Sequence, residues 1–185
     1  WIEKRIGLLH KTSINQKSAA EHLSKKIKGH LDFWDQINGE VINRFAALQK
    51  KGTIDILTCA ATHGYLPLLR ETPEAINGQI KTAVREHKRL FNIQPLGIWL
   101  PECAYYEGLD QIIFEAGLRY AVLDGHGLLH AKPRPRYGLY APICTRNGVA
   151  FFGRDSESTL PVWSAKDGYP GDSLYREFHK DLGWD

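Results

Sequence analysis

The sequence predicts an α/β fold built on a parallel β-sheet. Short apolar segments rich in β-branched residues alternate along the chain with longer segments of helical periodicity. Such short apolar runs are typical of parallel strands that are buried on both faces. Strands that alternate with helices at this spacing form βαβ units, and no low-complexity linker divides them. We therefore expect a single domain over residues 1–185.

The first predicted element is a long helix over about residues 15–50. Apolar residues recur in it at three- and four-residue spacing, which places them on one helix face: Leu31, Trp34, Ile37, Val41, Phe45 and Leu48. Lys50, Lys51 and Gly52 then supply a basic last turn and a glycine stop.

The alternation of strands and helices follows this helix. We expect strands over 53–60, 96–100, 120–123 and 149–152, and helices over 73–91 and 107–116. Pro73 occupies the first position of the helix over 73–91, where a missing N–H costs least. A proline-rich loop over 131–142 precedes the last strand.

Composition excludes several classes of protein. There is no apolar run of 18 residues, so we expect no membrane span, and no signal peptide opens the chain. The net charge of +3 resides in two short basic runs without interleaved aromatics, which does not favour nucleic-acid binding. Cys59, Cys103 and Cys144 form no CxxC motif, so we expect buried thiols in a reducing, cytoplasmic compartment. The absence of Met, including an initiator, suggests a fragment.

Polar residues follow each predicted strand at the point where the strand ends. They are Thr62 and His63, then Glu102, then Asp124 and His126, and finally Arg154 and Asp155. In parallel α/β folds the active site lies at the carboxyl ends of the strands. Four such coincidences in succession predict that these side chains share one rim.

Glu102 stands out because its sequence neighbours are largely apolar, and a carboxylate is costly to desolvate unless it is paired or used. It could act as the nucleophile of a glycosyl transfer, or it could be a structural residue bound to an arginine. His63 could contact a substrate hydroxyl or act as an acid–base, or it could be a hydrogen-bonded rim residue. With Asp124 and His126 it could also complete a set of three metal ligands, although a polar network without metal is the simpler interpretation.

Three further residues have a functional and a structural interpretation. Arg154 could clamp substrate hydroxyls or pair with Asp155 or Glu157. Trp163 could stack on a sugar ring or belong to the core. Gly171 lies in a turn-rich Gly-Tyr-Pro-Gly segment that could approach a ligand or form only a turn.

Three blocks of the sequence resemble glycoside hydrolase family 57. Residues 97–105, GIWLPECAY, are similar to its nucleophile motif. Residues 54–69, which include ATHGYLPLL, and residues 159–179, which include TLPVWSA and GYPG, resemble two other signatures. The last block is similar to the branching-enzyme subgroup, and the resemblance covers roughly residues 30–185.

The resemblance implies part of a (β/α)7 barrel of the glycoside hydrolase/deacetylase type. It implies a 1,4-α-glucan branching enzyme that retains anomeric configuration, uses no metal or cofactor, and acts on α-1,4-glucans such as amylose and glycogen in α-glucan metabolism. Glu102 carries over as the nucleophile, and Arg154, Gly171, His63 and Trp163 as substrate-binding residues.

Three parts of the family pattern are not matched. The family's His-rich first strand is missing, since His10 has the wrong context, and the helical C-terminal domain is also missing. The acid/base Asp that the family implies lies beyond Asp185, so the 185 residues alone are expected to be inactive. Other interpretations are an α-amylase-like hydrolase of the same family, a metal-dependent polysaccharide deacetylase, and a non-catalytic carbohydrate-binding module.

Overall fold

A computed structural model describes residues 4, 7 and 17–172 of the chain. It divides the chain into two compact units, Trp1–Asp55 and Ile56–Asp185, which are described separately. The prediction of a single domain stays a prediction. His10, the residues 174–179 on which the branching-enzyme likeness partly depends, and Asp185 lie outside the described residues.

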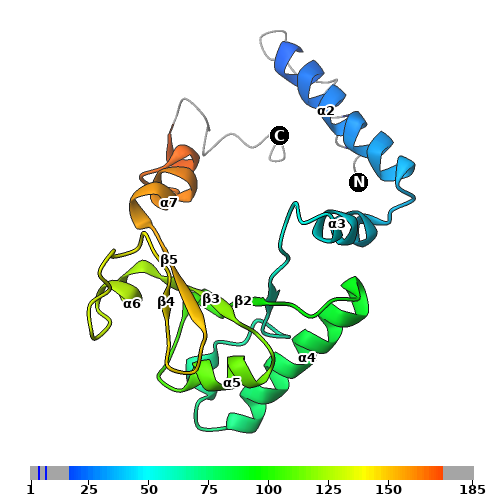
Figure 1. Cartoon of the computed structure of the whole chain (residues 1–185). Helices are drawn as coiled ribbons and strands as arrows, with labels where there is room; N and C mark the ends of the chain where they lie inside the picture. The colour runs from blue at the N-terminus through cyan, green and yellow to red at the C-terminus, as the bar shows by residue number, and fades with distance from the viewer. Residues whose placement is uncertain (1–3, 5–6, 8–16, 173–185) are drawn as a thin grey trace. The chain divides into compact units, whose positions relative to one another are not determined.

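The described part of the first unit consists of two helices where the sequence predicts one. Helix α2 spans Lys17–Gln36 and helix α3 spans Val41–Lys50 (Figure 1). The break occurs at Asn38 and Gly39, which both have positive φ, of 51° and 72°. The Gly39 amide donates to the Trp34 carbonyl and the Asn38 amide to the Asp35 carbonyl. This pair of hydrogen bonds is a Schellman motif, which ends a helix at an Asn or Gly residue.

The predicted apolar face of this unit is only partly buried. Ile37 is 4% exposed, whereas Trp34 and Phe45 are about half-exposed. Because the two helices do not continue one another, the residues no longer follow a single face, and the predicted continuous stripe is wrong.

The second unit contains a five-stranded sheet with the order β1-β2-β3-β5-β4. The strands are β1 (Thr58–Cys59), β2 (Gly97–Trp99), β3 (Tyr120–Asp124), β4 (Ile143–Cys144) and β5 (Ala150–Arg154). Strands β1, β2, β3 and β5 pair in parallel, as the sequence predicts. Strand β4 was not predicted, and it pairs antiparallel with β5 at the edge of the sheet.

Strand β1 is shorter than the predicted segment 53–60. Pairing begins at Thr58, which lies opposite Ile98. Residues 54–57 are not part of a strand, so their apolar pattern alone did not predict the start of β1 correctly.

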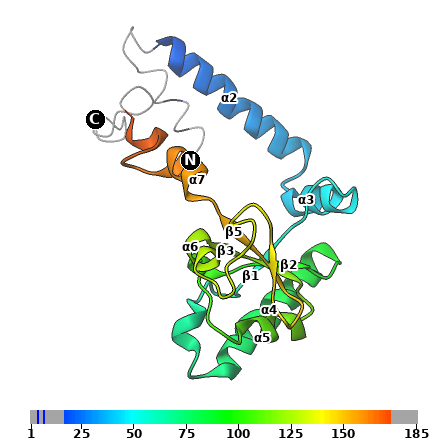
Figure 2. The same cartoon turned by 60° about the vertical axis from the view of Figure 1, so that its left-hand side comes forward.

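Helices cover the sheet and connect its strands. Helix α4 spans Pro73–Phe91, as predicted, and helix α5 spans Leu109–Glu115. Ile76, Ile80 and Val84 of α4 are buried in one apolar cluster with strand residues such as Ile98 and Phe151. In both views α4 and α5 lie below the strands, while the short helices α6 (Gly125–Leu129) and α7 (Ser156–Trp163) lie towards the opposite end (Figures 1 and 2).

Three short 3-10 helices, η2 (Leu66–Leu69), η3 (Pro101–Cys103) and η4 (Tyr169–Gly171), occupy loops. No helix among the described residues is long and apolar enough to cross a membrane.

Candidate active site

The candidate site is built on the loops that leave the carboxyl ends of the parallel strands. Strand β1 leads to His63, β2 leads to Glu102, and Asp124 and Arg154 end β3 and β5. Asp124 and Arg154 lie directly opposite each other in the β3–β5 pair. The register of the sheet therefore brings to one edge the polar residues that are separated by up to 91 positions in the sequence.

Glu102 projects from the short helix η3 with an unusual backbone. Its φ and ψ are 55° and 22°, and the next residue, Cys103, also has a positive φ of 54°. Left-handed backbone is costly for residues other than glycine, and such strain tends to occur at functional sites. The turn buries Pro101 and Cys103 and directs Glu102 outward, so the Glu102 side chain is 75% exposed despite its apolar neighbours.

His63 forms the described ion pair of Glu102. Its Nε2 lies 3.6 Å from Oε1 of Glu102, and its Nδ1 lies 3.1 Å from Sγ of Cys59. The backbone of His63 is also left-handed, with φ of 56°. Three groups in a row, a thiol, an imidazole and a carboxylate, thus connect the ends of β1 and β2.

Gln79 of α4 holds the turn that presents His63. Its side-chain oxygen accepts from the Thr62 amide at 2.9 Å, and its side-chain nitrogen donates to the Thr62 hydroxyl at 2.7 Å. Its backbone carbonyl accepts from the Ala61 amide at 3.2 Å. The His63 amide donates to the Ala60 carbonyl at 2.9 Å, which closes the turn.

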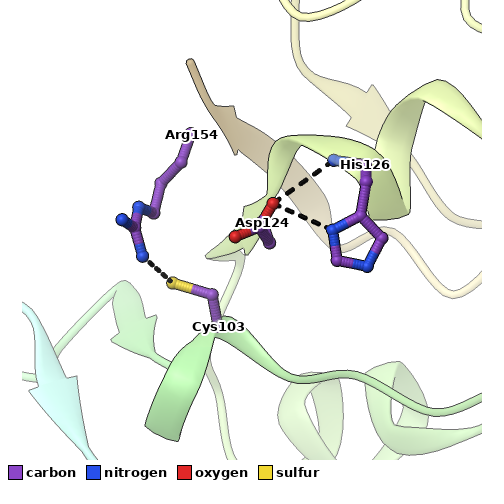
Figure 3. A network of polar contacts seen from close by, with 4 residues as sticks. All are labelled: Cys103, Asp124, His126 and Arg154. Atoms are coloured by element: carbon purple, nitrogen blue, oxygen red, sulfur yellow. Dashed lines mark hydrogen bonds and ion pairs between the residues drawn. The ribbon is translucent and has the colours of Figure 1, made fainter. Parts of the chain in front are cut away.

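Arg154 makes a second set of contacts, of which Figure 3 shows the one with Cys103. One of its guanidinium nitrogens donates to Sγ of Cys103 at 3.6 Å. Its Cζ lies 5.9 Å from the ring centroid of Trp163, within the range of a cation–π contact. The contact with Cys103, together with the negative charges of Asp124 and Glu102, raises the pKa of Arg154. The predicted alternative, a salt bridge with Asp155 or Glu157, is absent from the described contacts.

The two other carboxylates at this edge cap helices. Oδ1 of Asp124 accepts from the His126 amide and lies 3.0 Å from His126 Nδ1, as Figure 3 shows. The hydrogen bonds from His126 lower the pKa of Asp124. Asp155 accepts from the amides of Glu157 and Ser158 at the start of α7, and the hydrogen bonds from Ser158 lower its pKa. Both residues therefore have a structural role as N-caps.

A metal site does not form from these side chains. His63 pairs with Cys59 and Glu102, whereas His126 pairs with Asp124. Within residues 4, 7 and 17–172 no group of three or more His, Cys, Asp or Glu side chains is arranged to hold a metal ion. The deacetylase interpretation, which needs His63, Asp124 and His126 together, gains no support from this geometry.

Trp163 and Gly171 lie on the segment that follows β5. Trp163 is 56% exposed at the end of α7, so the alternative interpretation, a tryptophan of the core, is wrong. Gly171 lies in η4, where an added Cβ would be 2.3 Å from the Ala165 carbonyl oxygen. Gly171 also lines a shallow, open depression of about 410 Å³ together with Gly168 and Tyr169. Close packing against the backbone of Ala165 and Lys166, which follow α7, therefore already requires glycine at this position.

Cys59, Cys103 and Gln79 contact the site residues, although the sequence pattern gives them no site role. The prediction of buried thiols is wrong for two of the three cysteines, since only Cys103 is buried and Cys144 is exposed on β4. Cys59 is half-buried. Its place at the end of a strand, four residues before His63, was the signal that could have identified it.

A polar network supports the loop that follows Glu102. Tyr105 donates to Asp110 at 3.1 Å, and Asn147 donates to the other Asp110 oxygen at 2.9 Å. Burial and the negative charge of Asp110 raise the pKa of Tyr105 to about 12. Burial alone would raise the pKa of Asp110, but hydrogen bonds from Thr145, Asn147 and Tyr105 outweigh it and hold this pKa below its ordinary value.

Comparison with known proteins identifies the family of the chain. The family model described as glycosyl hydrolase family 57 matches residues 5–184. A 1,4-α-glucan branching enzyme of Thermococcus kodakarensis is 35% identical over 209 aligned positions, which cover 97% of this chain and 31% of that enzyme.

Solved structures give the same result. The α-amylase AmyC from Thermotoga maritima matches with a TM-score of 0.89 and 38% identity, over 100% of this chain and 37% of that one. The branching enzyme of Pyrococcus horikoshii matches with a TM-score of 0.84 and 32% identity, over 97% of this chain and 36% of that one. The chain thus spans about a third of the length of these relatives.

Proposed function

Because the chain belongs to glycosyl hydrolase family 57, with that family's (β/α)7-barrel type of fold, we propose that it carries the nucleophile half of a 1,4-α-glucan branching enzyme. The proposed substrate is an α-1,4-glucan. The observation that carries the proposal is Glu102, an exposed carboxylate on a strained turn at the carboxyl end of β2, inside the block that resembles the family's nucleophile motif.

In the proposed reaction the Glu102 carboxylate attacks the anomeric carbon of the sugar at the cleaved bond. A C–O bond to Glu102 forms while the glycosidic C–O bond breaks, and the leaving oxygen takes a proton from an acid/base group. The 6-hydroxyl of a second chain then displaces Glu102 and loses its proton to the same group. Asp124 and Asp155 already cap helices, which supports assigning the acid/base role to neither of them.

The remaining site residues are proposed to bind the glucan. Arg154 offers donors to sugar hydroxyls beside the exposed face of Trp163, on which a sugar ring can stack. His63 offers its Nε2 next to Glu102. Gly171 is proposed as a backbone contact, in addition to its packing against Ala165.

The decisive experiment uses the full-length protein, which includes the acid/base segment that the proposed reaction needs. It is incubated with amylose, and new α-1,6 linkages are counted. Glu102→Gln is expected to abolish both the branches and the covalent intermediate, because an amide is a poor nucleophile. Glu107→Gln, an exposed glutamate five residues further on, is the matched control and is expected to retain activity. Full branching by Glu102→Gln would refute the proposal.

A second candidate is an α-amylase-like hydrolase of the same family. It is favoured by the match to the Thermotoga maritima α-amylase, which covers this whole chain with a TM-score of 0.89. The same incubation separates the two activities, since a hydrolase produces new reducing ends without a matching number of branches.

A further inference from the structure

Cys59 is in direct contact with the histidine that faces the proposed nucleophile. Its Sγ lies 3.1 Å from Nδ1 of His63, well within hydrogen-bond distance for sulfur. The turn closed by the Ala60 carbonyl and braced by Gln79 sets this contact, so it does not depend on a mobile side chain alone. The far nitrogen of the same ring faces Glu102.

The direction of the Cys59–His63 hydrogen bond follows from the surroundings of the sulfur. Burial raises the pKa of the Cys59 thiol, so the sulfur keeps its proton at neutral pH. A protonated thiol has an S–H to donate, and Nδ1 of His63, 3.1 Å from the sulfur, is the group placed to accept it.

A neutral imidazole carries one proton, so an accepting Nδ1 leaves that proton on Nε2. We propose that Cys59 is a positioning residue, whose thiol holds His63 in the tautomer that directs an Nε2–H towards Glu102 and towards a sugar hydroxyl bound beside it. The opposite tautomer would turn a nitrogen lone pair towards the carboxylate, 3.6 Å away. The catalytic part of this inference rests on the proposed role of Glu102, whereas the tautomer does not.

The tautomer is tested on the full protein chain labelled with ¹⁵N-histidine, by long-range ¹H–¹⁵N NMR at a pH where the imidazoles are neutral. The signals that disappear in His63→Gln belong to His63. We expect a protonated Nε2 and an unprotonated Nδ1 in the unmodified chain. Cys59→Ala and the bulkier Cys59→Val, which also lacks a donor, are expected to give a mixture of tautomers, and Cys59→Ser to keep the original one.

Turnover of amylose gives the second measurement. Loss of the thiol is expected to lower kcat about tenfold, the lower end for partners that orient functional histidines, while KM changes less than about twofold. Cys59→Ser is expected to recover most of kcat, and Cys144→Ala, the exposed cysteine on β4, to leave it unchanged. If Cys59 had only a structural role, Cys59→Ser would not be expected to restore kcat. Cys59→Ala would not be expected to change the tautomer of His63 either.

Two results would overturn the inference: a proton on Nδ1 of His63 in the unmodified chain, or the same tautomer with and without the Cys59 donor. An unchanged kcat in Cys59→Ala would overturn its catalytic part. If instead Glu102→Gln stays active, the proposed function is wrong. The NMR measurement then still tests the tautomer of His63, which does not depend on the role of Glu102.

Discussion

Replacing Glu102 by glycine is expected to stabilise the protein while it removes the proposed activity. Glu102 has a left-handed backbone, with φ of 55° and ψ of 22°. That conformation costs a residue with a Cβ about 1–2 kcal/mol, which glycine avoids. Glycine loses about 0.5–1 kcal/mol more conformational entropy on folding than alanine does. The exposed contact of Glu102 with His63 contributes little. The net gain in the free energy of unfolding is therefore about 0.5–1 kcal/mol.

Glu107→Gly is the matched control, because Glu107 is also exposed but does not have a positive φ. Only the entropic penalty applies there, so this variant is expected to lose about 0.5–1 kcal/mol. Urea denaturation of the full chain, followed by circular dichroism, measures both changes. The two variants are expected to differ by about 1–2 kcal/mol, the cost of the left-handed backbone. Equal destabilisation by the two glycines would show that the backbone of Glu102 is not strained.

Three other predictions concern the core, the supporting network and the arginine. Ile80→Ala, at a fully buried position of α4, is expected to cost about 2–5 kcal/mol in urea denaturation, and a cost below 1 kcal/mol would contradict the core assignment. Asp110→Asn is expected to destabilise the fold by about 1–3 kcal/mol near neutral pH, because the side chain at this buried position keeps only one of its two acceptor oxygens. The pKa of Asp110 is lower in the folded protein than its ordinary value of 3.8. The stability that the ionised carboxylate contributes is therefore complete above pH 3.8 and is lost as the pH falls through the folded pKa. The unfolding curves of Asp110→Asn and of the unmodified chain should therefore converge in acid. Arg154→Lys keeps the charge but not the planar fork, so it is expected to weaken amylose binding measurably as a higher KM, whereas an unchanged KM would remove Arg154 from the glucan site.

Much of the fold was accessible from the sequence because its signals are local. The 73–91 helix begins at a proline and ends at Asn92 in the left-handed conformation, and both boundaries were predicted correctly. The parallel strands followed from short apolar segments between turn residues. Strand β4 could not be predicted, because its two residues have no periodicity and depend entirely on pairing with β5.

The candidate site was accessible in part for the same reason. That polar residues follow each strand can be read from the sequence, but which of them meet depends on register and on side-chain direction. The sequence predicts Asp124 and Asp155 as carboxylates on the rim of the site. In the structure, each accepts hydrogen bonds from the first amides of the helix that follows it. The contact between Arg154 and Cys103 joins residues 51 positions apart, and no local pattern encodes it.

Both outermost strands of the sheet, β1 and β4, are only two residues long, whereas the strands between them have three to five. An edge strand exposes unpaired amides and carbonyls that another chain can extend into an aggregate. Edges of two residues offer too short a template for such pairing, and the longer apolar strands β3 and β5 are kept away from the edges. The same strand order that gathers the polar rim therefore also leaves the described sheet with edges of only two residues.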